Sequence, residues 1–90
     1  MLLLKATIQF KKDLKKFKYS APILHGLNEV TKKLLLRSEM DPRYSDHRLR
    51  GEWKGSRDCH IAPDVVLIYR IDEESELLIF ERIGSHSDLF

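Results

Sequence analysis

Residues 57–69 read RDCHIAPDVVLIY, and this stretch decides how the rest of the chain is interpreted. Its first eight residues hold two carboxylates, a histidine and an arginine, and its last five are apolar at every position. An apolar run without alternation, bounded by turn residues, predicts a central strand buried on both faces. Charged groups beside a buried strand need partners or a purpose, so the same stretch is the first candidate for a functional site.

The residues before this stretch predict one strand and two helices. Residues 2–7 show the alternation of a short strand, and from Ile8 the apolar spacing becomes helical. A serine followed by proline in the first turn opens a second helix at Ser20, and Asp41-Pro42 requires it to end near residues 37–38. The first helix is basic and amphipathic, because its apolar stripe is surrounded by Lys11, Lys12, Lys15, Lys16 and Lys18.

The residues after the helices predict a loop and three strands. Residues 40–51 are polar and without period, which is typical of a loop. From Trp53 the period is two, which places Asp58 and His60 on one side of a strand. Strands over 65–69 and 77–83 follow, the latter with Leu78, Phe80 and Arg82 on one face, and residues 85–90 form a tail or a single helical turn. We therefore predict one α+β domain over residues 1–90: an N-terminal strand, a two-helix hairpin and a three-stranded antiparallel meander.

Composition describes an ordinary soluble globular protein, with 42% hydrophobic and 33% charged residues and a net charge of +2. No apolar run approaches the ~20 residues that span a bilayer, so we expect no membrane association. The single cysteine, Cys59, rules out an internal disulfide and suits a reducing cytoplasm. Charge is uneven: residues 1–50 carry 12 Lys+Arg against 5 Asp+Glu, and residues 51–90 carry 4 against 9. Two mutually attracting faces, or a basic surface that meets phosphate, would both explain this division.

Three histidines, His47, His60 and His86, can meet on one sheet face with nearby carboxylates and an arginine. RNA cleavage without a metal needs such a set: a base for the 2′-OH, an acid for the leaving 5′-oxygen, and a cation for the phosphorane. Histidine serves either proton role near neutral pH, and arginine keeps its charge while it binds phosphate. The candidate catalytic residues are therefore His47, Asp58, His60, Asp64, Arg82 and His86.

Other readings of these residues remain open. Two or three histidines with an aspartate could bind zinc, although the spacing matches no familiar zinc motif and Arg57 and Arg82 would oppose a cation, so we expect no metal or other cofactor. Cys59 alternates to the side opposite His60, which indicates a core residue rather than a nucleophile. Trp53 could stack on a base or lie buried at the start of a strand.

Several spaced blocks of residues 46–90 resemble the YafQ branch of the RelE/ParE superfamily of type II toxin–antitoxin toxins. The blocks are Asp46-His47-Arg48-Leu49, Gly51-Glu52-Trp53-Lys54-Gly55, Arg57-Asp58-Cys59-His60, Pro63-Asp64, Leu67-Ile68-Tyr69, Glu81-Arg82-Ile83-Gly84-Ser85-His86 and Leu89-Phe90. The resemblance implies the small RelE fold, with helices packed on an antiparallel sheet. It also implies an mRNA interferase that cuts messenger RNA in the ribosomal decoding site, and an antitoxin partner whose complex with the toxin binds operator DNA.

The resemblance also implies roles for individual residues. His86 would protonate the leaving oxygen, His47 or His60 would be the base held by Asp64, and Arg82 would stabilise the phosphorane. Phe90 would stack near the scissile base. Candidate substrate contacts are Phe90, Arg57, Trp53, Lys11, Lys12 and Lys15, the last three through ribosomal RNA.

One departure and one alternative accompany this reading. The branch can carry a tryptophan directly after the motif aspartate, where this chain has Val65. The alternative function is a non-catalytic binding module on the same fold, because fold alone does not prove an activity. That module would use the basic helix around residues 11–18 and would not need the histidines.

Overall fold

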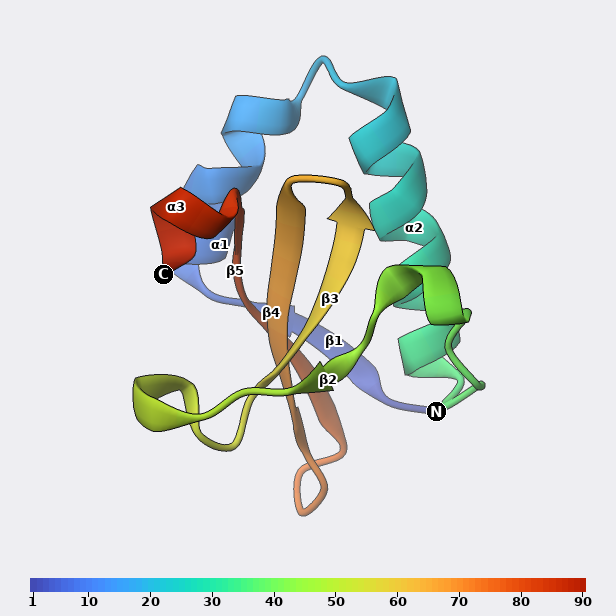
Figure 1. Cartoon of the computed structure of the whole chain (residues 1–90). Coiled ribbons are helices and arrows are strands. Elements are labelled where there is room, and N and C mark those ends of the chain that lie inside the picture. The colour runs from blue at the N-terminus through green and yellow to red at the C-terminus, as the bar shows by residue number, and fades with distance from the viewer.

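The computed structural model describes all of residues 1–90, and a single mixed sheet organises it (Figure 1). The strand order is β1-β5-β4-β3-β2, with β1 parallel to β5 and all other neighbours antiparallel. The strands are β1 (Leu3–Ala6), β2 (His47–Arg48), β3 (Arg57–Ala62), β4 (Val65–Asp72) and β5 (Leu77–Gly84). The predicted α+β class is confirmed, and the apolar run 65–69 begins the central strand β4, as its composition requires.

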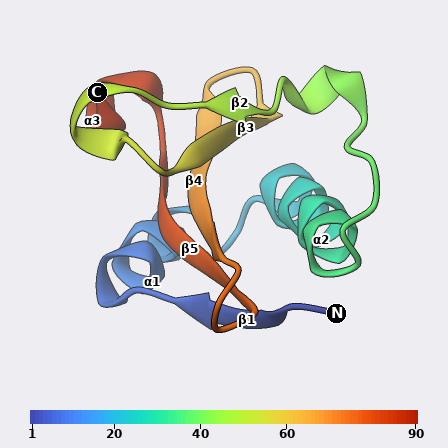
Figure 2. The same cartoon turned by 90° about the horizontal axis from the view of Figure 1, so that it is seen from below.

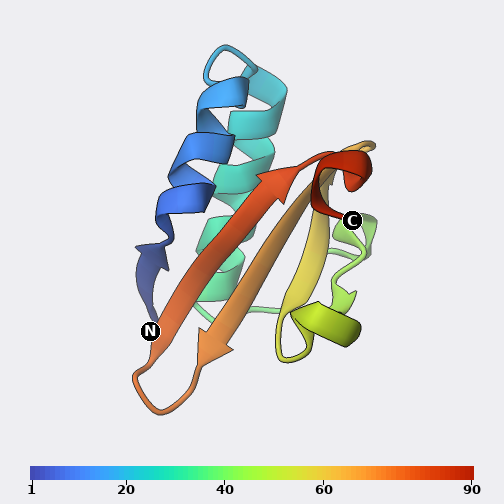
Figure 3. The same cartoon turned by 90° about the vertical axis from the view of Figure 1, so that its left-hand side faces the viewer.

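Helices α1 (Ile8–Leu14) and α2 (Ala21–Leu35) both cover one face of the sheet (Figure 3). A 3₁₀ turn, η1 (Lys15–Phe17), extends α1, so both predicted helices are confirmed. The Phe10 and Phe80 rings lie 5.2 Å apart between α1 and β5. A Cβ at Gly26 of α2 would approach the carbonyl oxygen of Ile61 in β3 to 3.1 Å, so glycine is what lets α2 lie this close to the sheet. No helix has the length and apolarity needed to cross a bilayer.

The opposite face of the sheet carries a smaller cluster and the C-terminal helix α3 (His86–Leu89). Leu89 of α3 packs on Val66 and Ile68 of β4, and Leu49 and Trp53 pack against the same cluster. The helical turn predicted for residues 85–90 is therefore present. It keeps the last residues of the chain on the face away from α1 and α2 (Figure 3).

Three local predictions were wrong, and two of them concern where loops and strands begin. Residues 40–51 are not all loop, because they contain the 3₁₀ turn η2 (Pro42–Tyr44) and the two-residue edge strand β2. Residues 51–53 form another 3₁₀ turn, η3 (Gly51–Trp53), so β3 starts at Arg57 rather than at Trp53. Figure 2 shows β1 and β2 at opposite edges of the sheet. A strand of two residues is too short to produce a period that the sequence could reveal.

A β-bulge in β5 overturned the third local prediction, that Phe80 and Arg82 share a face. Ile68 pairs with Arg82 and Tyr69 pairs with Phe80, so Glu81 is an extra residue in β5. Such a residue resets the alternation of side chains. Phe80 and Ile83 consequently both enter the core, and Arg82 lies beside its partner Ile68 on the other face.

Candidate active site

Three histidines from three separate elements lie in a file across the sheet face that carries α3. The ring centroids of His86 and His60 are 5.2 Å apart, and those of His60 and His47 are 6.4 Å apart. The Phe90 ring extends the file, 6.1 Å from His86. We call His86, His60 and His47 the histidine file. Its spacing is small enough for one ribose-phosphate unit to touch neighbouring rings.

Strand register brings His60 and His86 together. His60 pairs with Val66 in β4, and Val66 pairs with Gly84 at the end of β5. The chain then turns back at once into α3, whose N-cap Ser85 accepts a hydrogen bond from the Asp88 amide at 3.2 Å. Leu89 fixes the helix by packing on β4, so His86 is held over the same row of the sheet as His60.

His47 is held at both ring nitrogens by acceptors. Its Nδ1 lies 2.7 Å from the Ser45 carbonyl oxygen, and its Nε2 lies 3.0 Å from Oδ1 of Asp58. A carbonyl can only accept, so Nδ1 carries the ring proton and donates it to Ser45, which leaves Nε2 facing the Asp58 carboxyl group. Ser45 adopts a left-handed backbone (φ 48°) where the chain turns from η2 towards β2.

Asp58 is the buried acid of the site, with only 3% of its surface exposed. Its Oδ1 has no aligned hydrogen-bond donor, because the close approach of His47 is an ion-pair contact without hydrogen-bond geometry. Burial raises the pKa of Asp58, and the positive charges of His47, His60 and His86 only partly oppose this rise. A buried acid with an unsatisfied oxygen is typical of a functional site rather than of structural packing.

Asp64 approaches the file from the turn between β3 and β4. Its Oδ1 lies 3.5 Å from Nδ1 of His86, and both side chains are more than half exposed. At that distance and exposure the contact orients the His86 ring weakly and leaves it accessible to substrate. The structure thus places Asp64 beside His86, whereas the resemblance assigned it to the base.

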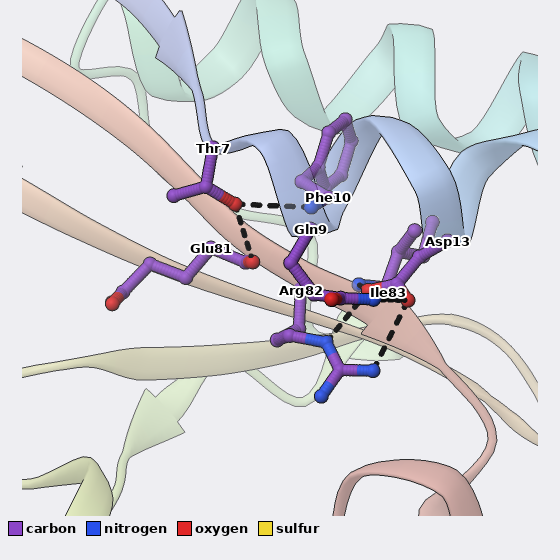
Figure 4. Close-up of polar contacts among 7 residues, drawn as sticks. All are labelled: Thr7, Gln9, Phe10, Asp13, Glu81, Arg82 and Ile83. Atoms are coloured by element: carbon purple, nitrogen blue, oxygen red, sulfur yellow. Dashed lines mark hydrogen bonds and ion pairs between the residues drawn. The ribbon is translucent and has the colours of Figure 1, made fainter.

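Arg82 is bound to a partner that sequence reasoning missed. Its Nε and Nη2 atoms donate to the Asp13 carboxylate of α1 at 2.7 and 3.1 Å (Figure 4). The Ile83 amide and the Gln9 side chain also donate to Asp13, at 3.2 and 3.1 Å. Hydrogen bonding to Asp13 raises the pKa of Arg82. The guanidinium offers five donors in all, so it retains some for a substrate phosphate.

The end of β1 explains why Asp13 is needed. β1 pairs with β5 only as far as Phe80, so the last residues of β5 lack a neighbouring strand on that side. Asp13 accepts the Ile83 amide there, and the Thr7 hydroxyl donates to the Glu81 carbonyl at 2.9 Å (Figure 4). Asp13 is also the only acidic residue among the first 28, a signal that could have identified it as a partner for a buried cation.

Several predicted substrate contacts lie away from the histidine file. Arg57 projects from the other face of β3, where its Nε donates to Asp46 at 3.2 Å, and the Tyr69 hydroxyl donates to the same carboxylate at 2.7 Å. Trp53 packs against the small cluster under α3, and its indole N–H is buried without an acceptor. Lys11, Lys12 and Lys15 are exposed on α1 and η1. Cys59 is fully buried in the main core, and burial raises the pKa of its thiol.

The described residues contain no group of three His, Cys, Asp or Glu side chains with the geometry to hold a metal ion. The histidines face one another, but their carboxylate neighbours approach them one at a time. What the arrangement offers instead is proton transfer: exposed imidazoles, a buried acid and a fixed arginine.

Comparisons with known proteins agree on one family. Residues 2–90 match a family model described as a bacterial toxin of type II toxin–antitoxin systems, YafQ. The mRNA interferase toxin YafQ of Escherichia coli K12 is 42% identical over 79 residues, which cover 88% of this chain and 74% of the relative. The metal-bound toxin of Helicobacter pylori superposes with a TM-score of 0.92 at 38% identity, over 100% of both chains. One chain of the E. coli DinJ–YafQ complex superposes on this chain with a TM-score of 0.86 at 34% identity, over 100% of this chain and 99% of that chain.

Proposed function

Because this chain belongs to the YafQ family of type II toxin–antitoxin toxins, we propose that it is an endoribonuclease that cuts messenger RNA on the ribosome. The chemistry needs no metal or cofactor. The observation that supports it most directly is the histidine file, with rings 5.2 and 6.4 Å apart on one exposed face. Fold similarity alone would not distinguish a nuclease from a binding module, but a set of proton-transfer groups does.

The reaction begins when His47 or His60 removes the proton of the ribose 2′-OH. The freed oxygen attacks the adjacent phosphorus and forms a phosphorane with an additional negative charge, which Arg82 stabilises through donors that Asp13 leaves free. His86 then gives a proton to the departing 5′-oxygen. The products are a 2′,3′-cyclic phosphate and a 5′-hydroxyl. The base has gained one proton and the acid has lost one, so exchange with solvent restores both groups.

The neighbouring carboxylates support different roles for the histidines. With the ring proton on Nδ1, Nε2 of His47 can accept the proton of the 2′-OH, and the Asp58 carboxylate 3.0 Å from Nε2 stabilises the imidazolium that forms. Asp64 contacts His86 only at 3.5 Å, so His86 stays mobile enough to meet the leaving group. Phe90 lies 6.1 Å from His86 and can stack on the base next to the cut.

The partners follow from the family and from charge. A cognate antitoxin binds the toxin, as DinJ binds YafQ in E. coli. We expect operator DNA to be contacted only through that complex. The exposed lysines of α1 and η1, Lys11, Lys12 and Lys15, contact ribosomal RNA. We therefore expect the protein to act in the cytoplasm, where the ribosomes are.

The decisive test compares His86→Ala with a matched histidine outside the file. His86→Ala should reduce cleavage of mRNA on purified ribosomes about 10²–10⁴-fold, because one proton transfer is lost. His25→Ala, an exposed histidine of α2, should cleave normally. Both variants should melt like the unmodified protein. Normal cleavage by a folded His86→Ala protein would reject the site and favour the binding-module alternative.

A second arm of the test addresses the metal reading, because a relative from H. pylori is metal-bound. Cleavage in excess EDTA should equal cleavage without it. A loss of activity that added divalent metal restores would show that a cation takes part.

A further inference from the structure

A large hollow at the far end of the sheet has no role in the function described so far. It lies where β3 begins and β4 ends, and it encloses about 810 Å³. The chain between β2 and β3 supplies most of its wall. Its lining is Arg48, Leu49, Arg50, Gly51, Lys54, Gly55, Ser56, Arg57, Ile71 and Glu73.

The charge of this hollow is strongly positive. Four of its lining residues are cations, namely Arg48, Arg50, Lys54 and Arg57. Arg57 is paired with Asp46 at 3.2 Å, which leaves the other three as the unpaired charge of the hollow. Its one carboxylate, Glu73, already accepts a hydrogen bond from Arg37 at 3.2 Å, so it is not free to neutralise them. Another hollow of the molecule, beside η2, is lined by three carboxylates and two cations. The excess of cations is therefore a property of this hollow and is not shared by the one beside η2.

Two features hold the basic side chains in place before any ligand arrives. Arg57 is fixed by Asp46, which the Tyr69 hydroxyl also contacts, and 37% of the Arg57 side chain remains exposed. The segment that carries Lys54 is bounded by Gly51 and Gly55 at φ of +68° and +94°, a left-handed geometry that other residues adopt at a cost. The wall of the hollow is therefore ordered before a ligand binds.

The hollow borders the edge strand that carries His47, the last member of the histidine file. The file runs from Phe90 through His86 and His60 to His47, which stands on the edge strand β2. Arg48 follows His47 on β2, and successive residues of a strand point to opposite faces. A strand of RNA that leaves the file at His47 and crosses this two-residue edge would thus arrive at Arg48 and Arg57, which are register partners.

We propose that the hollow lined by Arg48, Arg50, Lys54 and Arg57 binds backbone phosphates of the RNA strand that flanks the cut. This inference rests on the proposed function. The ligand class is the phosphodiester backbone, because guanidinium and ammonium groups without a free carboxylate select phosphate and carry no base preference. The hollow binds and positions the RNA strand, and the histidine file cleaves it.

Salt-dependent binding tests this directly. The probe is a short fluorescent single-stranded RNA, and the protein carries His86→Ala so that the RNA stays intact. The triple variant Arg48→Ala, Arg50→Ala and Lys54→Ala should bind at least about tenfold more weakly. The slope of log affinity against log KCl, measured over about 50–200 mM, should fall by about 2, since each lost phosphate contact in a single strand removes about 0.7. Lys54→Gln alone should lower the slope by about 0.7.

A matched triple variant controls for charge alone. Lys5→Ala, Lys32→Ala and Lys33→Ala remove the same charge from exposed positions outside the hollow, and they should change the slope little. Equal slopes for the two triple variants would overturn the proposal. So would a hollow variant that binds RNA normally but no longer binds the antitoxin, because the hollow would then be a protein interface.

Cleavage separates this inference from the function on which it rests. With His86 intact, the hollow variant should show a raised KM and an unchanged kcat for mRNA on ribosomes, because it lacks only ground-state binding. If the unmodified protein cuts RNA and the hollow variant matches it in KM and in salt slope, the inference fails and the function stands. If the unmodified protein does not cut RNA, the function fails, and the binding slopes still report on the hollow.

Discussion

Asp13 and Asp58 are the two buried carboxylates of this fold, and burial treats them alike: each is 3% exposed. Their pKa values are nevertheless shifted in opposite directions. Burial pushes the pKa of Asp13 up, but hydrogen bonds from Arg82, Gln9 and the Ile83 amide outweigh it, and the net pKa is lowered. Burial also raises the pKa of Asp58, where no aligned donor reverses it.

The difference between the two sites shows how one residue type serves structure and chemistry. Asp13 accepts hydrogen bonds from Arg82, Gln9 and the Ile83 amide, so it stays ionised and fixes α1 to β5 beside the bulge. Asp58 is left with an unsatisfied oxygen beside His47, so its negative charge remains available to stabilise a proton that arrives on that imidazole. A satisfied charge stabilises a fold, and an unsatisfied one is retained where function uses it.

The largest expected effect is the loss of stability caused by Asp13→Ala. Removing the carboxylate leaves Arg82 unpaired beside the core and the Ile83 amide without its acceptor. Breaking one partner of a buried pair costs about 3 kcal/mol. Thermal unfolding should then occur roughly 12–24 °C lower, since each kcal/mol shifts the midpoint of a domain this size by about 4–8 °C.

Glu39→Ala is the matched control for that measurement, because Glu39 is an exposed carboxylate on the loop after α2. It should change the free energy of unfolding by no more than about 0.5 kcal/mol. An Asp13→Ala protein as stable as the control would mean that the ion pair is dispensable.

Asp58→Asn should have the next largest effect, and on activity rather than on stability. The substitution removes the charge that supports His47, so cleavage on ribosomes should fall about tenfold, a part of what a full proton transfer contributes. The free energy of unfolding at pH 7 should not fall, because a poorly satisfied buried charge has been replaced by a neutral side chain of similar shape. Urea titration beside a cleavage assay measures both, and a destabilised but fully active variant would contradict the contrast.

Much of this arrangement could be predicted from the sequence, and the exceptions have a common cause. The strand β4, both helices and the C-terminal turn follow from periods that are long enough to detect. The approach of His60 to His86 follows from the order of the predicted strands, whereas His47 lies on β2, which was predicted as loop. The two-residue strand β2 and the extra residue Glu81 have no period of their own, so the face of Arg82 was mispredicted. Asp13 is separated from Arg82 by 69 positions, and no local pattern links them.

The smallest effect, and the most specific, is the acid dependence of the two aspartates. The pKa of Asp13 is lower in the folded protein than in the unfolded chain, so its contribution to stability is complete above the unfolded value of about 3.9 and disappears as the pH falls through the folded value. The pKa of Asp58 is raised, so its cost to stability is present at neutral pH and is relieved on acidification.

Unfolding free energies measured by urea between pH 7 and pH 3 should therefore separate the two residues by sign. The difference between the unmodified protein and Asp13→Asn should be positive at pH 7 and shrink below about pH 4. The difference between the unmodified protein and Asp58→Asn should be zero or negative at pH 7 and approach zero from below, beginning at a higher pH because the folded pKa is raised. Two differences of the same sign would show that the buried carboxylates are equivalent, and that Asp58 is held as firmly as Asp13.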